Sequence, residues 1–126
     1  MKEIIASPKA PGAIGPYSQA TAIENLVFTS GMLPIDPSVG KIVAETIEDQ
    51  TRQSLENLKA VLEAAGASPA SVLKTTCYLF DIGNFKRFNA VYAEYFPENA
   101  PARSCFEVAC LPQNALVEIE AVAVRA

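Results

Sequence analysis

Apolar residues recur along the chain at spacings of three to four residues, which predict two helices, and at shorter, strand-like spacings, which predict four strands. The longest regular segment is residues 46–65, where apolar positions three or four residues apart form one stripe and charges lie opposite. The stripe consists of Ile47, Thr51, Leu55, Leu58, Leu62 and Ala65. Thr46 and Asp49 resemble a capping box at the start, and Gly66 followed by Pro69 supplies the stop. One face of this helix is therefore expected to be core, and nothing on the helix suggests chemistry.

The other elements are shorter. Segments rich in β-branched and aromatic residues predict strands at 26–30, 72–80, 103–109 and 116–124. A second helix is expected from about Asn84 to Phe96, with aromatic residues on one side and Pro97 at its end. Residues 7–16 contain three prolines and two glycines and are expected to be an irregular lead-in. The order predicts a single α+β domain over residues 1–126, a mixed β-sheet with two helices packed on one face.

The strand at 72–80 is apolar on both sides, which bears on assembly. Strict alternation places Leu73, Cys77 and Leu79 on one side and Val72, Tyr78 and Phe80 on the other. Two helices, each about 10 Å wide, cover roughly 20 Å of sheet, or about four strands, on one face only. The other face would leave an apolar patch in water, so an oligomer is expected.

Composition narrows the possible functions. Half of the 126 residues are hydrophobic, which excludes disorder and supports a real core. The net charge of −4 disfavours general nucleic-acid binding, which needs a basic surface. The chain has no histidine, which removes Ser-His-Asp and Cys-His catalysis and His-ligated zinc. Proton transfer must therefore fall to Glu, Asp, Lys, Tyr, Cys or water.

The number and spacing of the cysteines and the length of the apolar runs indicate a cellular compartment. Cys77, Cys105 and Cys110 form no C-x-x-C pair, and their odd number is typical of free thiols in a reducing environment. The first residues have no signal-type apolar region, and no apolar run approaches membrane length. A cytoplasmic location without a membrane partner is the default expectation.

Candidate chemical groups lie on the last two predicted strands. Alternation places Arg103 and Cys105 on one face of their strand, and Glu118 and Glu120 on one face of theirs. If the two strands form a hairpin, Glu118 lies near Arg103 or Cys105. Strand geometry alone does not choose between the two glutamates.

Each candidate also has a structural interpretation. Arg103 and Glu118 could form an ion pair between adjacent strands. Cys105 could be a small buried core residue, and without histidine its thiolate lacks a base. Asn89 lies on or beside the apolar face of the second helix and could be a packing residue with satisfied hydrogen bonds. Tyr17, in a rigid loop, signals little by itself.

Taken in order, four segments resemble one known family. They are Gly15-Pro16-Tyr17-Ser18-Gln19-Ala20, Thr29-Ser30-Gly31-Met32-Leu33-Pro34, Asn84-Phe85 with Phe88-Asn89, and Pro101-Ala102-Arg103-Ser104-Cys105. The tail Val117-Glu118-Ile119-Glu120-Ala121 is similar as well. The family is that of the RidA/YjgF reactive-intermediate deaminases, and the match spans essentially the whole chain.

This resemblance implies a chorismate-mutase-like fold and an enamine/imine deaminase. Its substrates would be 2-iminopropanoate and 2-iminobutanoate, which pyridoxal-dependent dehydratases release and which are hydrolysed to 2-oxo acids and ammonia. No cofactor and no metal are expected. The resemblance also implies a homotrimer with pockets between protomers. In the arrangement considered, one protomer supplies Arg103 and Glu118, and its neighbour supplies Tyr17 and Asn89.

The resemblance assigns a role to each site residue. Arg103 would bind the substrate carboxylate through its planar fork. Glu118, rather than Glu120, would orient or deprotonate the attacking water. The main-chain N–H groups of Cys105 and Gly31 would hold or polarise the substrate. The pocket would be shaped by Tyr17, Ser30 and Asn89.

Three other functions stay open. A binding or regulatory module that captures 2-oxo acids without turnover would need Arg103 but not Glu118. A ribonuclease or translation inhibitor, an activity ascribed to some relatives, is disfavoured by the acidic charge and the lack of histidine. A cysteine hydrolase acting through Cys105 would lack a base.

Overall fold

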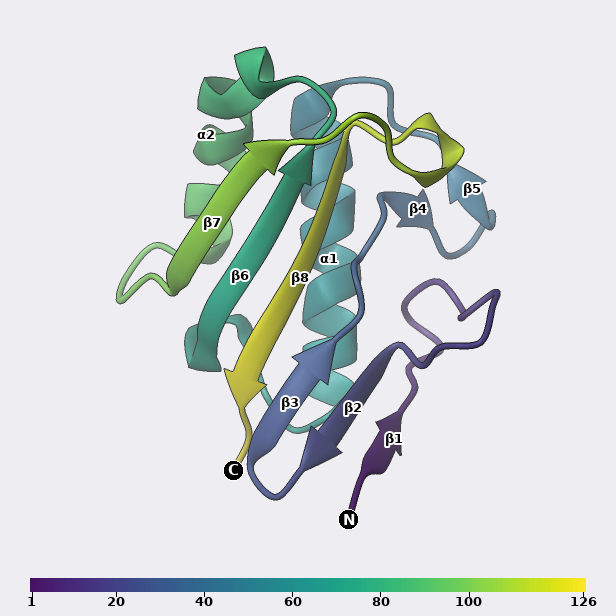
Figure 1. Cartoon of the computed structure of the whole chain (residues 1–126), viewed down its shortest axis with the longest axis vertical. Coiled ribbons are helices and arrows are strands. Elements are labelled where there is room, and N and C mark those ends of the chain that lie inside the picture. Colours follow the sequence, from purple (N-terminus) through teal and green to yellow (C-terminus); the bar gives the residue numbers. More distant parts are fainter.

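A mixed six-stranded sheet forms one layer of the molecule, and two helices cover one of its faces (Figure 1). The structure is a computed structural model and describes residues 1–126. The strand order is β1-β2-β3-β8-β6-β7, and β4 pairs with β5 in a separate ribbon. The strands are β1 (Glu3–Ile5), β2 (Ala20–Ile23), β3 (Leu26–Thr29), β4 (Ile35–Asp36), β5 (Lys41–Ile42), β6 (Val72–Leu79), β7 (Ala102–Glu107) and β8 (Val117–Val124). The helices are α1 (Ile47–Ala64) and α2 (Phe85–Tyr95).

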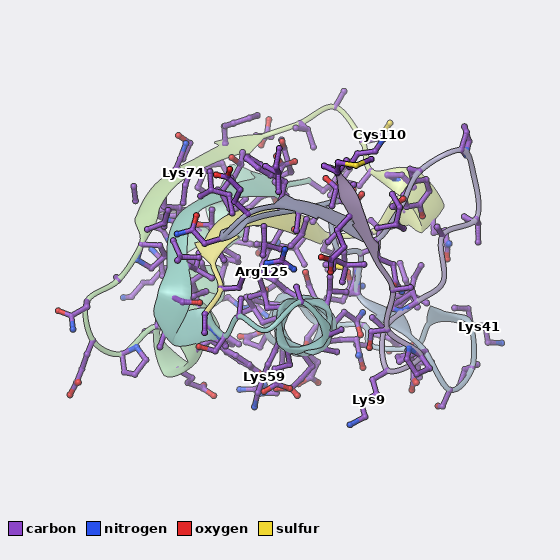
Figure 2. All side chains as sticks on the ribbon, turned by 90° about the horizontal axis from the view of Figure 1, so that it is seen from below. Lys9, Lys41, Lys59, Lys74, Cys110 and Arg125 are labelled. Carbon is purple, nitrogen blue, oxygen red and sulfur yellow. The ribbon has the colours of Figure 1, made fainter.

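The core lies between the sheet and the helices, and β8 contributes every second residue to it. Its buried residues are Val117, Ile119, Ala121 and Ala123. The residues between them are only partly buried and point to the opposite face, as strand alternation requires. Figure 2 shows α1 end on beneath the curved sheet. The stripe predicted on α1 is buried throughout, which confirms it as the core face.

The ends of α1 are set by local chemistry that the sequence predicts. The Thr46 hydroxyl accepts a hydrogen bond from the Asp49 N–H at 3.1 Å and so caps the first turn. Past the last turn, Gly66 has a φ of +83°, a left-handed conformation that favours glycine. The Ala67 N–H then donates to the Leu62 carbonyl at 2.8 Å, which satisfies an end carbonyl of the helix.

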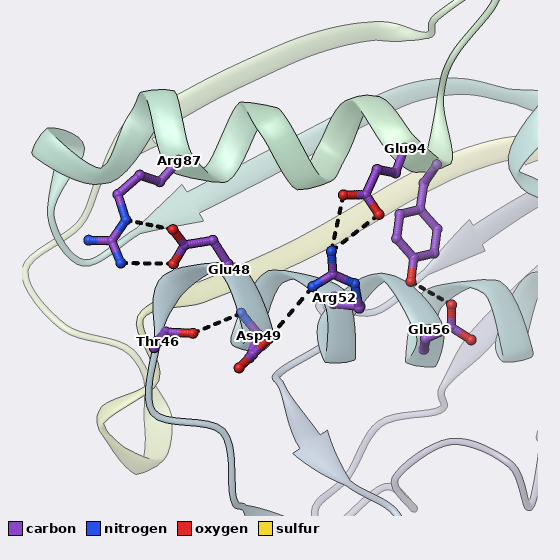
Figure 3. Close-up of polar contacts among 8 residues, drawn as sticks. Thr46, Glu48, Asp49, Arg52, Glu56, Arg87 and Glu94 are labelled. Carbon is purple, nitrogen blue, oxygen red and sulfur yellow. Dashed lines mark hydrogen bonds and ion pairs between the residues drawn. The ribbon is translucent and has the colours of Figure 1, made fainter.

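Charged side chains join α1 to α2 on their outer surface (Figure 3). Arg87 of α2 donates two hydrogen bonds of 2.8 Å to Glu48 of α1. Arg52 of α1 donates to Glu94 of α2 at 3.0 and 3.2 Å. Because these groups are exposed, water screens them and each pair contributes little to stability.

β7 and β8 do not form a hairpin, so the condition under which Glu118 would lie near Arg103 or Cys105 is not met. β6 lies between them, parallel to β7 and antiparallel to β8. A parallel neighbour requires a crossover, which α2 supplies between β6 and β7. The chain after β7 then crosses the end of β6 to reach its other side. Arg103 and Glu118 are therefore separated by a strand, and the proposed ion pair between adjacent strands does not exist.

A bulge at Leu73 also changes the faces of β6. The pairing with β8 passes from Val72 opposite Ala123 to Lys74 opposite Val122, which leaves one extra residue in β6. Val72 is consequently buried on the helix side with Cys77, whereas Leu73 is 51% exposed. Strict alternation had placed Val72 and Leu73 on the wrong sides.

The sheet face away from the helices nonetheless carries many apolar side chains. Large side chains exposed on it are Ile4, Ile23, Phe28 and Phe106, and Tyr78, Val122 and Val124 are partly buried there. This agrees with the prediction that two helices leave one face uncovered. Neither helix has the length and apolar composition needed to cross a membrane.

Candidate functional site

The first cluster of predicted residues is built around Arg103, on the helix side of β7. Its Nη1 donates a hydrogen bond to the Asn89 Oδ1 of α2 at 2.7 Å. Its guanidinium carbon lies 4.7, 5.3 and 5.9 Å from the ring centroids of Tyr92, Phe85 and Phe88. Such rings attract a cation and restrict its orientation. The aromatic side of α2 therefore contributes to the core and also surrounds the arginine.

Arg103 has no acidic partner within the chain. None of the four ion pairs of the structure involves it. An amide oxygen neutralises none of its charge, and only one of its five N–H donors bonds to Asn89. A hollow lined by Asn89, Tyr92, Pro101 and Arg103 opens beside it. The arrangement is suited to binding an anion supplied from outside the protomer.

Cys105 lies near this cluster on the same face of β7. It is half-buried and pairs in register with the buried Cys77 of β6. Burial raises the pKa of the Cys105 thiol, and the nearby charge of Arg103 only partly opposes this. The thiol therefore stays protonated at neutral pH, which disfavours a thiolate nucleophile. β7 is the edge strand of the sheet, so part of its main chain has no neighbouring strand to bond.

The second cluster joins Glu118 of β8 to the segment that follows β3. A Cβ placed on Gly31 would overlap the Glu118 carboxylate, so glycine is required here for close approach. Met32 pairs with Ile119, with N–H to O distances of 2.8 and 3.3 Å, and this pairing holds the segment against β8.

The Tyr17 loop is attached to the same segment. The Ser30 hydroxyl donates to the Ser18 carbonyl at 2.6 Å, and the Ser30 N–H donates to the Gln19 carbonyl at 2.9 Å. A cavity of about 170 Å³ lies between these segments and is lined in part by Tyr17, Gly31 and Met32. Tyr17, Ser30, Gly31 and Glu118 therefore form one neighbourhood.

The environment of Glu118 makes its carboxylate more basic. Burial raises its pKa, and the negative charge of Glu120 on the same face raises it further. The Tyr78 hydroxyl, from the neighbouring strand, donates to Glu120 at 2.8 Å and leaves Glu118 without that donor. A carboxylate with a raised pKa is suited to accept a proton from water near neutral pH. Only the structure separates the two glutamates in this way.

The two clusters face opposite sides of the sheet. Arg103 is in register with the buried Thr75, on the helix side. Glu118 is opposite Tyr78 and alternates with the buried Val117 and Ile119, so it points to the open face. Arg103 and Asn89 form one cluster, which contradicts the arrangement that assigned them to different protomers.

Gln19 lies in the motif of residues 15–20, but the sequence alone suggests no role for its side chain. Its Oε1 accepts the Ser7 N–H at 2.6 Å, and its Nε2 donates to carbonyls of Ser7, Ala10 and Pro11. It thereby holds the proline-rich lead-in, residues 7–16, that precedes Tyr17. The available signal in the sequence was an amide side chain close to a segment that contains three prolines and so has few N–H donors to bond its own carbonyls.

Comparison with known proteins shows which solved structure this domain resembles and which family it belongs to. The crystal structure of Escherichia coli TdcF with bound serine is 45% identical, with a TM-score of 0.93, over 98% of this chain and 99% of that chain. The family model described as Endoribonuclease L-PSP matches residues 7–125. The chain belongs to this family, the RidA/YjgF family that its motifs resemble.

Relatives of known sequence cover the chain almost completely. A RutC family protein of Pyrococcus horikoshii is 54% identical over 125 residues, or 99% of each chain. The 2-iminobutanoate/2-iminopropanoate deaminase of Salmonella typhimurium is 50% identical over 128 residues, again 99% of each.

Proposed function

We propose that the protein hydrolyses 2-imino acids, such as 2-iminopropanoate and 2-iminobutanoate, to 2-oxo acids and ammonia. The observation that carries this proposal is Arg103, which is oriented by Asn89 and three rings and has no acidic partner. A 2-imino acid has a carboxylate next to the C=N carbon, and a fixed guanidinium binds such a group through two hydrogen bonds. The name of the Salmonella relative supports the same chemistry.

The reaction needs one water and one base. Glu118 takes a proton from water as the water oxygen bonds to the C=N carbon, and it passes this proton to the imine nitrogen, which gives a carbinolamine. Glu118 then takes the hydroxyl proton of the carbinolamine and delivers it to the amino nitrogen. The C–N bond breaks as the C=O bond forms, ammonia leaves, and Glu118 is again a carboxylate. Imines hydrolyse readily in water, so holding the substrate and the water in place supplies much of the required acceleration.

The remaining residues hold the substrate. Main-chain N–H groups of Cys105 and Gly31 polarise or orient it, a role that uses no thiol. The pocket is shaped by Tyr17, Ser30 and Asn89. A module that only binds 2-oxo acids would need Arg103 alone, so Glu118, with its raised pKa beside Gly31, favours turnover.

A complete site requires a second protomer. Arg103 and Glu118 face opposite sides of one sheet, so a substrate cannot touch both within one chain. We infer a homotrimer in which Arg103, Asn89 and Cys105 of one protomer meet Tyr17, Ser30, Gly31 and Glu118 of the next. The apolar open face of the sheet would be covered in such an assembly. The number three comes from the family resemblance.

The test is a coupled assay. The protein is added to a threonine or serine dehydratase reaction, and the release of 2-oxo acid is followed with and without it. Faster release that depends on protein concentration is the expected result. Release at the uncatalysed rate, together with measurable binding of 2-oxo acids, would replace the deaminase with a binding module. Cleavage of RNA by the same preparation without imine hydrolysis would favour a ribonuclease.

A further inference from the structure

Four polar side chains lie on the buried face of α1, among leucine and valine residues, and three of them form hydrogen bonds to other segments of the chain. Gln50, Ser54 and Asn57 are 5%, 0% and 1% exposed. Spacings of four and three residues place them in one row along the helix. Burying a polar side chain costs free energy unless its groups are hydrogen-bonded. The hydrogen-bond partners of this row therefore indicate which segments it holds in place.

The row bonds to the main chain of connecting segments. The Ser54 hydroxyl donates to the Met32 carbonyl at 2.7 Å. The Asn57 amide donates to the carbonyls of Leu33 and Ile35 at 3.0 and 2.8 Å, and its Oδ1 accepts from Gln53. Both amide hydrogens of Asn57 are thus used on one short segment, residues 32–35.

The opposite side of that segment is bonded to β8. The Met32 carbonyl accepts from the Ile119 N–H as well as from Ser54. Each of these two residues has a neighbour in the proposed site: Gly31 precedes Met32, and Glu118 precedes Ile119. The Glu118 carboxylate occupies the space that a Gly31 side chain would fill. A shift of the segment away from α1 would therefore change the gap that holds this carboxylate.

We propose that Ser54 and Asn57 are positioning residues of the hydrolytic site, which fix the segment after β3 and so set the gap between Gly31 and Glu118. The inference rests on the proposed function and extends it to a helix on which the sequence showed no chemistry. Neither residue touches the substrate. Both act through the main chain of Met32, Leu33 and Ile35.

The same helix offers a matched control. Thr51 is fully buried on the same face, and its hydroxyl has no hydrogen-bond partner. Thr51→Val removes an equally buried polar atom while keeping the shape of the side chain. It breaks no bond to the segment after β3, so it separates the effect of positioning from that of altering the core.

The experiment compares Ser54→Ala and Asn57→Leu with Thr51→Val. Heteronuclear NMR follows the titration of the Glu118 carboxyl, identified by the absence of its signal in Glu118→Gln. The ionisable groups facing it are Glu120 and Tyr78 of the same chain and, in the proposed trimer, Arg103 of the neighbouring protomer. None of the three tested variants alters these groups. In parallel, kcat and KM are measured in the coupled dehydratase assay.

Ser54→Ala and Asn57→Leu are expected to lower kcat about tenfold or more, while KM changes less than about threefold, because the base is misplaced and Arg103 is not. The pKa of Glu118 should fall toward its ordinary value, since a loosened segment admits water. Thr51→Val should leave kcat, KM and this pKa unchanged.

Wild-type kcat and an unchanged Glu118 titration in folded Ser54→Ala would overturn the proposal. If Asn57→Leu does not fold, Ser54→Ala alone decides. Ser54→Ala is expected to fold, because the Met32 carbonyl keeps its hydrogen bond to the Ile119 N–H. A fall in kcat without any change in the Glu118 titration would also overturn it. If the wild-type protein hydrolyses no imine, the proposed function fails, and the titration still decides whether Ser54 and Asn57 position Glu118.

Discussion

The guanidinium of Arg103 is surrounded by the Asn89 amide and three aromatic rings, and it forms no ion pair within the chain. Arg103→Ala should lower kcat/KM by about a hundredfold or more while the fold is retained, because charge-assisted bonds to the substrate carboxylate are lost. Arg103→Lys should also lose most activity, since a point charge does not reproduce the fork. Turnover by the folded alanine variant near the wild-type rate in the coupled assay would refute the assignment.

Glu118 and Cys105 are expected to respond differently to substitution. Glu118→Gln removes the proposed base but keeps the shape, and should lower kcat by about a hundredfold or more. Cys105→Ala should keep most of the activity, because the proposed mechanism uses only the main chain of Cys105. The two variants are compared in the same coupled assay. An inactive Cys105→Ala beside an active Glu118→Gln would establish thiol catalysis instead.

The raised pKa of Glu118 also predicts how stability depends on pH. The folded protein holds the Glu118 proton more tightly than the unfolded chain, so this residue reduces stability as pH rises through the ordinary glutamate pKa of about 4.3 and above. Glu118→Gln should therefore raise Tm at pH 7. The gain should shrink as pH falls below that value, where both states are protonated. A Tm at pH 7 that is equal to or below that of the wild type would contradict this explanation.

At the scale of elements, the contact between α1 and α2 combines a buried apolar side with an exposed polar one. Arg87 and Glu48 are joined by two bonds on the exposed side. Arg87→Ala should lower Tm by less than about 4 °C at low salt, and the difference should diminish in about 1 M salt. Lys86→Ala on the same helix is the control, because Lys86 is exposed and forms no ion pair. A Tm difference that persists at high salt would show that packing, not charge, is responsible.

Long elements were predictable from the sequence, whereas short ones and their pairing were not. α1 has a continuous apolar stripe, a cap at Thr46 and a stop at Gly66, so both its face and its limits follow from local rules. β1, β2, β4 and β5 have four residues or fewer, too few for alternation to be recognised. β3 is equally short, and it was predicted from its β-branched and aromatic residues rather than from alternation. The placement of β6 between β7 and β8 depends on the crossover through α2, which no local pattern encodes. The bulge at Leu73 has no local signal either.

At the scale of the whole molecule, the sequence singled out candidate residues but did not indicate how they are grouped in space. Motifs singled out Arg103, Asn89, Gly31 and Glu118, and the structure divides them between two faces of one sheet. Grouping depends on strand order, so it required the structure. Ser54 and Asn57 were missed because their bonds join α1 to a distant segment of the chain.

The proposed division of the site between protomers is tested most directly by mixing inactive variants under conditions of subunit exchange. Arg103→Ala and Glu118→Gln damage different halves of the site. An equal mixture should therefore regain about one quarter of wild-type activity, the fraction of interfaces that unite two intact halves in a randomly exchanged ring. Arg103→Ala mixed with an inactive Asn89 variant should regain none, because both damage the same half. Mass spectrometry verifies that subunits have exchanged. Recovery limited to the first mixture is the predicted result. A first mixture that exchanges fully and stays inactive, or a protein that is monomeric at micromolar concentration, would contradict the account.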